Sequence, residues 1–221
     1  MTSLAVPLRK SIEDWAERLQ RTSPLAILAK KGELPPRAFA FYLESLRFLF
    51  QQSERNLAWA LARSEQLGNP ALIEYFRRKS REERGHDRWA MSDLAQLPRG
   101  ITQALQPAHA VVSLAGLQRT LISRHPVCFA TYILWTEYFT VLIGDDWLDS
   151  LSACGYERTG VSAIAKHVEA DREHAAAGFG EFDELWQGDP EPSVILAVVE
   201  EAGRVFEAFC EEVCGEARRV A

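Results

Sequence analysis

The octapeptide His-Val-Glu-Ala-Asp-Arg-Glu-His carries the side chains best suited to chemistry in this sequence. It places His167, Asp171 and His174 at offsets 0, 4 and 7. On an α-helix, which turns about 100° per residue, these positions fall within a stripe of roughly 60°. A solvated helix face is the alternative, but two imidazoles in register with a carboxylate predict a metal site.

A second pattern is the pentapeptide Glu-Glu-Arg-Gly-His that ends at His86. Glu83 and His86 have the i, i+3 spacing by which helical-bundle diiron proteins present a carboxylate and an imidazole to one metal. Glu82 reaches the same position at i, i+4 and is a weaker candidate, while Gly85 leaves room for a close neighbour. The alternative is a charged surface turn, and neighbouring basic residues favour a solvated helix: Arg77, Arg78, Lys79, Arg81 and Arg84.

Glu137 is the only charged residue in the 18-residue stretch VCFATYILWTEYFTVLIG, residues 127–144. An unpaired carboxylate in such apolar surroundings is costly or holds a proton, so a metal or a buried cation is expected beside it. A glutamate whose tip reaches the surface is the alternative. The stretch is long enough to span a membrane, but Glu137 and the adjoining Asp145 and Asp146 favour a buried core helix.

Two further acids lie in one aromatic segment. Glu44 is the only acid in FAFYLESLRFLF, residues 39–50, and Arg47 follows one turn later. An ordinary Glu–Arg pair is the favoured interpretation. Glu44, or Glu54 further along the same helix, is alternatively an extra ligand or a substrate contact.

The elements that must position these residues are helical almost throughout. Apolar residues recur at three- and four-residue spacing between joints marked by proline. This periodicity predicts helices over residues 7–21, 24–31, 36–65, 70–95, 108–123, 126–153, 158–186 and 192–217. No strand, repeat or linker stands out, so we expect a single compact all-α bundle over residues 1–221.

Composition limits the classes of partner. The chain has 221 residues, a net charge of −6 and no basic run, which argues against nucleic acid. Charged residues throughout positions 1–22 leave no apolar signal segment, and the four cysteines form no CxxC pair. We therefore expect a cytoplasmic protein with reduced thiols that binds no membrane.

Together the three main patterns supply three histidines and three carboxylates. Such a set suits two irons, or two manganese ions, with positions left open for O₂ and substrate, and suits zinc less well. The predicted ligands, which are also the predicted catalytic residues, are Glu83, His86, Glu137, His167, Asp171 and His174.

These motifs resemble those of the heme-oxygenase-like diiron oxidases, in the wider group that contains TenA and the pyrroloquinoline-quinone synthase. The family pattern is a Glu and a His, then a Glu, then His-x3-Asp-x2-His. Here His86 precedes Glu137 by 51 residues, and Glu137 precedes His167 by 30. Most members place the first Glu seven residues before the first His, where this chain has Lys79. The Glu-x-x-His variant looks instead like that of the undecene-forming fatty-acid decarboxylase.

The resemblance covers roughly residues 20–215 and implies a seven-helix bundle with two irons between its core helices. It implies oxidation of a small carboxylic or amino acid by O₂, and a homodimer. Aromatic residues on the core helices suit an apolar or aromatic substrate, although such residues are more often simply core. They are Phe41, Tyr42, Phe48, Trp59, Tyr132, Trp135, Tyr138 and Phe139.

Two other classes of function remain open at this point. A TenA-type thiaminase would use a cysteine nucleophile, for which Cys128 is the candidate, and the pyrroloquinoline-quinone synthase uses the same fold without a metal. Alternatively, the bundle stores iron or binds a small molecule without catalysis.

Overall fold

The all-α prediction is confirmed by a computed structural model, which describes residues 3–219 and contains no strand within them. The helices are α1 (Ala5–Thr22), α2 (Pro24–Lys30), α3 (Pro36–Leu67), α4 (Pro70–Glu82), α5 (Asp87–Leu94), α6 (Arg99–Thr102), α7 (His109–Arg124), α8 (Pro126–Ala153), α9 (Ser162–Leu185) and α10 (Pro192–Arg219). A short 3₁₀ helix, η1 (Arg158–Val161), precedes α9.

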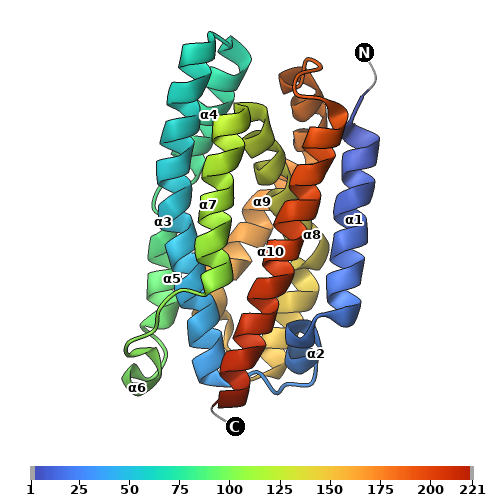
Figure 1. The fold of residues 1–221 in the computed structure, drawn as a ribbon. Coiled ribbons are helices and arrows are strands. Elements are labelled where there is room, and N and C mark those ends of the chain that lie inside the picture. The colour runs from blue at the N-terminus through green and yellow to red at the C-terminus, as the bar shows by residue number, and fades with distance from the viewer. Residues whose placement is uncertain (1–2, 220–221) are drawn as a thin grey trace.

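The long helices lie side by side along one axis (Figure 1). Helices α1, α3, α7 and α10 form the near side in this view, with α8 and α9 behind them, and the short helices α2 and α6 lie at the lower end. The contacts are most extensive between α8 and α9, and α3 packs against α4, α5 and α7. Helix α9 also contacts α4 and α5, so the segments that carry the predicted ligands lie next to one another along α9.

Proline and capping residues explain most helix boundaries. Helices α2, α3, α4, α8 and α10 each begin at a proline, whose fixed φ suits the first helical position and whose missing N–H costs nothing there. Asn69 accepts a hydrogen bond from the Leu72 amide at the start of α4, and His125 caps α8 in the same way. The predicted starts of these five helices consequently coincide with the observed ones.

The predicted helix over residues 70–95 is wrong in its middle, because a turn at residues 83–86 separates α4 from α5. Gly85 has φ +83°, a left-handed conformation that glycine adopts without strain, and its N–H donates a 2.7 Å hydrogen bond to Glu54 Oε1. Glu83 and His86 therefore lie in this turn and not on one helix. Gly85 is needed for its backbone conformation, and the room for a neighbour that the sequence suggested is not the reason.

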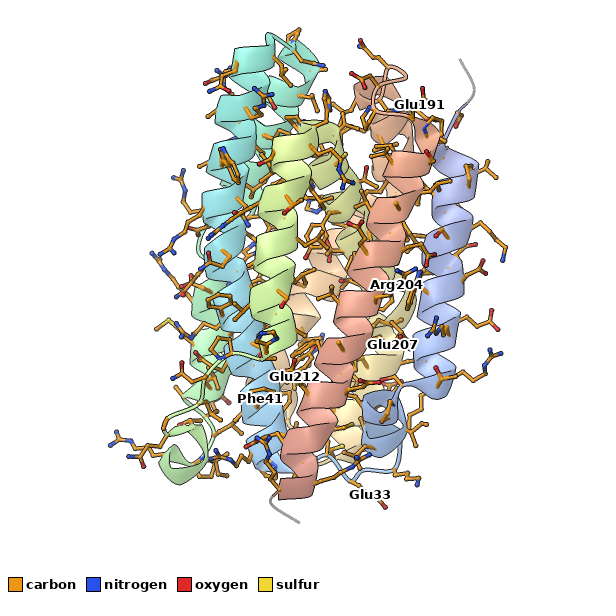
Figure 2. The ribbon with its side chains drawn as sticks, viewed as in Figure 1. Glu33, Phe41, Glu191, Arg204, Glu207 and Glu212 are labelled. Carbon is orange, nitrogen blue, oxygen red and sulfur yellow. The ribbon has the colours of Figure 1, made fainter. Side chains whose placement is uncertain are left out.

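The core consists of two clusters of buried apolar side chains that are joined through partly buried residues such as Phe206. Charged side chains, among them Glu33 and Arg204, project from the outside of the bundle (Figure 2). Helix α8 contains an 18-residue segment with a mean hydropathy of 1.4, which is long and apolar enough to cross a membrane. However, 61% of this segment is buried inside the protein. This burial is the pattern of a core helix.

Helices α8 and α9 approach closely at Gly144. A Cβ at this position would lie 2.4 Å from Cγ2 of Val168. Non-bonded carbon atoms do not come this close, so a glycine is required where the two helices pack against each other. The same two helices carry Glu137 and the His-x3-Asp-x2-His segment, and their spacing therefore sets the geometry of the site.

We predict that Gly144→Ala lowers the free energy of unfolding by about 1–3 kcal/mol, because the added methyl group overpacks the helix contact. The measurement is urea denaturation followed by circular dichroism. Gly180→Ala is the matched control on α9, because nothing lies within 4 Å of its added Cβ. The control should be stabilised by roughly 0.5–1 kcal/mol, the helix-interior preference for alanine. Equal effects of the two substitutions would contradict the close approach.

Candidate metal centre

The six predicted ligands form two groups of three in the structure. One contains Glu83, His86 and His167, and the other contains Glu137, Asp171 and His174. Within each group one ligand atom per residue lies within 4.8 Å of the others. Two ligand atoms on opposite sides of an ion are roughly 4 Å apart, since each lies about 2.0–2.2 Å from it. Each group could therefore hold one metal ion.

The first cluster, defined as Glu83, His86 and His167, contains an imidazole prepared for a metal. Nδ1 of His167 lies 2.8 Å from the carbonyl oxygen of Ala163, which can only accept, so Nδ1 carries the proton and Nε2 has a free lone pair. Nε2 is buried and has no hydrogen-bond partner among residues 3–219. A backbone carbonyl that fixes the ring in this way is the usual support of a metal-bound histidine. The donor set therefore fits a metal ion.

Burial also keeps this imidazole neutral. It lowers the pKa of His167, although the nearby carboxylate of Glu83 opposes the effect. Nδ1 of His86 lies 3.1 Å from Oε2 of Glu83. Burial opposes ionisation of Glu83, but His86 brings its pKa below the usual value. A neutral imidazole and an ionised carboxylate are the forms that bind metals.

Aromatic rings hold the two imidazoles of the first cluster in place. The ring of Phe50 stacks on His167 with centroids 4.5 Å apart, and Trp89 stacks on His86 at 4.1 Å. The two imidazoles meet edge to face at 4.7 Å. These contacts restrict the rotation of both rings, which favours a preorganised site. Neither Phe50 nor Trp89 was predicted from the sequence, although Trp89 follows His86 at the i, i+3 spacing.

The second cluster is defined as Glu82, Glu137, Asp171 and His174. Nδ1 of His174 lies 3.5 Å from Oε1 of Glu137 and 3.7 Å from Oδ1 of Asp171, and Nε2 lies 3.7 Å from Oε2 of Glu82. The carboxylate of Asp171 raises the pKa of His174, and those of Glu137 and Glu82 raise it further, whereas partial burial lowers it. Glu82, the weaker candidate in the sequence, thus contributes to this cluster, whereas Glu83 contributes to the first.

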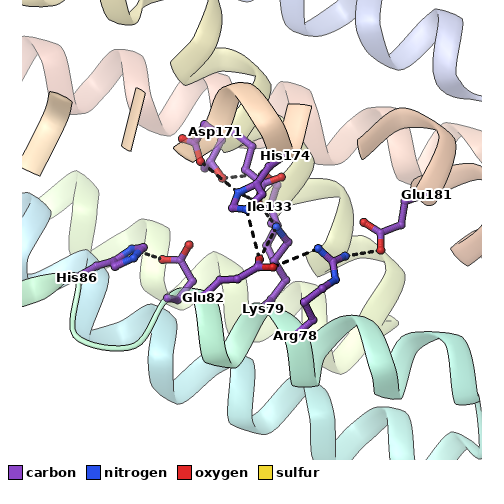
Figure 3. A network of polar contacts seen from close by, with 11 residues as sticks. Arg78, Lys79, Glu82, His86, Ile133, Asp171, His174 and Glu181 are labelled. Carbon is purple, nitrogen blue, oxygen red and sulfur yellow. Dashed lines mark hydrogen bonds and ion pairs between the residues drawn. The ribbon is translucent and has the colours of Figure 1, made fainter. Parts of the chain in front are cut away.

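The buried cation expected beside Glu137 is Lys79. Its Nζ lies 2.6 Å from Oε1 of Glu137 and 2.9 Å from Oε2 of Glu82, and its side chain is 2% exposed (Figure 3). Burial raises the pKa of Glu137 to about 7, an effect that the ammonium opposes. Burial by itself would lower the pKa of Lys79, but the two carboxylates raise it. The interpretation of this part of α4 as solvated is therefore wrong for Lys79.

The α9 stripe and the two acids of α3 differ in whether they join the candidate metal sites. The stripe of His167, Asp171 and His174 lies on α9 as one run, but the structure divides it between the two clusters. Glu44 pairs with Arg47 at 2.5 Å and joins neither cluster. Glu54 caps the turn through Gly85. Both acids therefore have structural partners.

Both clusters border one cavity of about 190 Å³. The charged residues and the histidine of its lining are Lys79, Glu83, Glu137, His167 and Asp171. The rest of the wall is mostly apolar and includes Leu46, Leu49, Phe50, Tyr132, Trp135, Phe139, Ile143, Trp147, Val168 and Phe206. Of the aromatic residues expected inside the bundle, Trp59 is instead 42% exposed.

Cys128, the candidate nucleophile of a thiaminase, is buried on α8. Burial raises the pKa of its thiol to about 11, which disfavours the reactive thiolate. Among the described residues, those that line the 190 Å³ cavity do not include Cys128. This placement disfavours a cysteine-dependent reaction in the cavity.

Comparison with known proteins identifies the fold. No protein-family model matches the chain, and no curated protein matches it. A domain of unknown function with a heme oxygenase-like fold from Shewanella denitrificans is 18% identical, with a TM-score of 0.85, 96% of this chain covered and 93% of the other. A TenA homolog from Pseudomonas syringae is 12% identical, with a TM-score of 0.73 and coverages of 95% and 92%.

A CADD-like protein of unknown function from Nostoc punctiforme is also 12% identical, with a TM-score of 0.71 and coverages of 96% and 99%. These identities are low, so the comparisons speak for the fold alone. The chain has a heme oxygenase-like fold, shared with TenA-like and CADD-like proteins, and it carries two candidate His–carboxylate metal sites within it.

We predict that His167→Ala removes metal from the first cluster. Affinity should fall by more than the roughly 10–100-fold that loss of a supporting contact costs, because a ligand itself is removed. The measurement is metal per chain by mass spectrometry after anaerobic loading with Fe(II) and desalting. His109→Ala is the matched control, since His109 is exposed on α7 and belongs to neither cluster. An unchanged metal content in the His167 variant would exclude it as a ligand.

Proposed function

We propose that this protein is a non-heme iron oxidase that uses O₂ to oxidise a small carboxylic or amino acid. Two irons would be held, one by Glu83, His86 and His167 and one by Glu137, Asp171 and His174, with manganese as the second choice of metal. The observation that carries the proposal is the buried Nε2 of His167, which faces no hydrogen-bond partner and lies beside Glu83 and His86.

The donor set favours iron. Mixed imidazole and carboxylate ligation suits iron and manganese, and three protein ligands per ion leave positions open for O₂ and substrate. Bound Fe(II) would supply the electrons that reduction of O₂ requires. A nicotinamide or flavin route has no support in the sequence, which contains no GxGxxG motif.

The residues around the clusters have recognisable tasks in such an enzyme. The carbonyl of Ala163 holds His167 in one tautomer, and Phe50 and Trp89 fix the ring planes of the two imidazoles. The apolar wall of the cavity excludes water from the space beside the ligands, which limits side reactions of activated oxygen. Preorganised ligands and a dry pocket are what the protein must contribute.

The form of the cavity supports the proposed substrate class. The charged residues of its lining belong to or contact the two clusters, and most of its other lining residues are aliphatic or aromatic. A molecule with one polar group and an apolar remainder would place the polar group near the metals and the remainder in the cavity. The resemblance to the diiron oxidases is the reason for proposing an acid as substrate. The lining of the cavity is the reason for proposing one polar group on an apolar molecule.

We predict that Fe(II)-loaded protein consumes O₂ and that at least one member of a panel of fatty and amino acids accelerates the uptake. Metal-free protein should consume none. His174→Ala should lower the rate by about 100-fold or more, because it removes a ligand. The same change should shift Tm by less than about 4 °C, since apolar packing stabilises the bundle. An oxygen electrode and thermal denaturation provide the two readouts.

Full metal loading without oxygen uptake for any acid would contradict the oxidase and favour an iron-binding protein without catalysis. Activity that persists after metal removal would favour a metal-independent enzyme of the TenA or pyrroloquinoline-quinone synthase type. In that case Cys128→Ala separates the two, because a thiaminase would lose activity and the quinone synthase would retain it.

A further inference from the structure

The two clusters differ in their balance of charge. In the first cluster Glu83 is the only carboxylate, and among residues 3–219 no lysine or arginine forms an ion pair with it. The second cluster contains three carboxylates and already has a cation, the ammonium of Lys79. Arg78 reaches Glu82 at 3.3 Å, but it also pairs with Glu181 on the outer side (Figure 3).

The ammonium contacts carboxylate oxygens of the second cluster that also lie near His174. Oε1 of Glu137 lies 2.6 Å from Nζ of Lys79, and the same atom is the one that lies 3.5 Å from Nδ1 of His174. Oε2 of Glu82 lies 2.9 Å from the ammonium and 3.7 Å from Nε2 of His174. An ammonium that stays this close to the same oxygen atoms would repel a divalent ion bound to them and weaken its binding.

Charge leads to the same conclusion. Three carboxylates in a largely buried group need compensation, since unpaired buried charges are strongly unfavourable. Lys79 supplies one positive charge, and a divalent ion would supply two in its place. The substitution is possible in space, because Lys79 lines the 190 Å³ cavity and its flexible side chain can turn into it.

We propose that Lys79 is the resident cation of the second cluster and that a metal enters this cluster only by displacing the ammonium. Loading is therefore stepwise: the first cluster binds the first metal tightly, and the second cluster binds its metal more weakly. The inference rests on the proposed function, because it concerns the same two metal sites, but its test measures binding and not activity.

The experiment is calorimetric titration of the metal-free full chain with Mn(II), supported by metal analysis after desalting. The wild-type protein should show one tight and one weak equivalent. Lys79→Met removes the charge while retaining an unbranched chain, and it should tighten the weak equivalent by at least about 10-fold, the lower end of effects next to metal ligands. Lys79→Gln is the second neutral variant, in case the methionine variant does not fold.

Two controls assign the effect. Lys79→Arg retains the positive charge and should leave the second equivalent weak. Lys10→Met removes a lysine from the surface of α1, where it pairs with Asp14, and should behave as wild type. Combining Lys79→Met with Asp171→Asn should weaken the gained equivalent again, because Asp171 belongs to the second cluster, whereas His167→Ala should remove the tight one.

Two equally tight equivalents in the wild-type chain would overturn the inference and leave the proposed function standing. A weak second equivalent that neither neutral Lys79 variant tightens would also overturn it. Absence of metal binding in the wild type and in every folded Lys79 variant would overturn the inference and the metal-dependent function together.

Discussion

The ion pair between Lys79 and Glu137 is the interaction on which the interior of this bundle depends. Helix α8 is apolar for most of its length, and Glu137 is its one charge deep in the core. Removing two charges from water is costly, and close pairing at 2.6 Å offsets much of that cost. The pair also joins α4 to α8, while His174 connects both to α9. The polar contacts that connect α4, α8 and α9 in the core are thus made largely by the candidate metal ligands themselves.

The break between α4 and α5 solves a geometric problem. A continuous helix would present Glu82, Glu83 and His86 at fixed angles from one axis. The turn instead directs Glu82 toward Glu137 and His174, and directs Glu83 and His86 toward His167. Gly85 makes the turn possible through its left-handed backbone, and Glu54 of α3 anchors it. A local disruption of the helix therefore separates two clusters where a regular helix would serve one.

The fold by itself leaves the chemistry open. Heme oxygenase-like bundles include TenA-like proteins and proteins whose function is unknown, so similarity of the backbone does not select a reaction. The donor atoms of the site, the contacts that support them and the polarity of the adjoining cavity favour some reactions over others. The fixed tautomer of His167 carries most weight, because a buried ring nitrogen without a partner is unfavourable unless another atom occupies the space beside it.

The sequence alone determined the long helices and, apart from the break between α4 and α5, their boundaries to within a few residues, because apolar periodicity, proline at first helical positions and capping are local signals. It also supplied the six metal-ligand candidates: helical spacing indicated His167, Asp171 and His174 on α9, and a lone charge in an apolar segment indicated Glu137. The spacing of Glu83 and His86 selected a pair that the structure places in a turn. Only the tertiary structure decided how they divide between two clusters, because Glu137 and His174 meet across 37 residues of chain. The burial of Lys79 was likewise invisible: one basic residue among several on α4 looks solvated, and only the packing of α8 and α9 against it removes it from water.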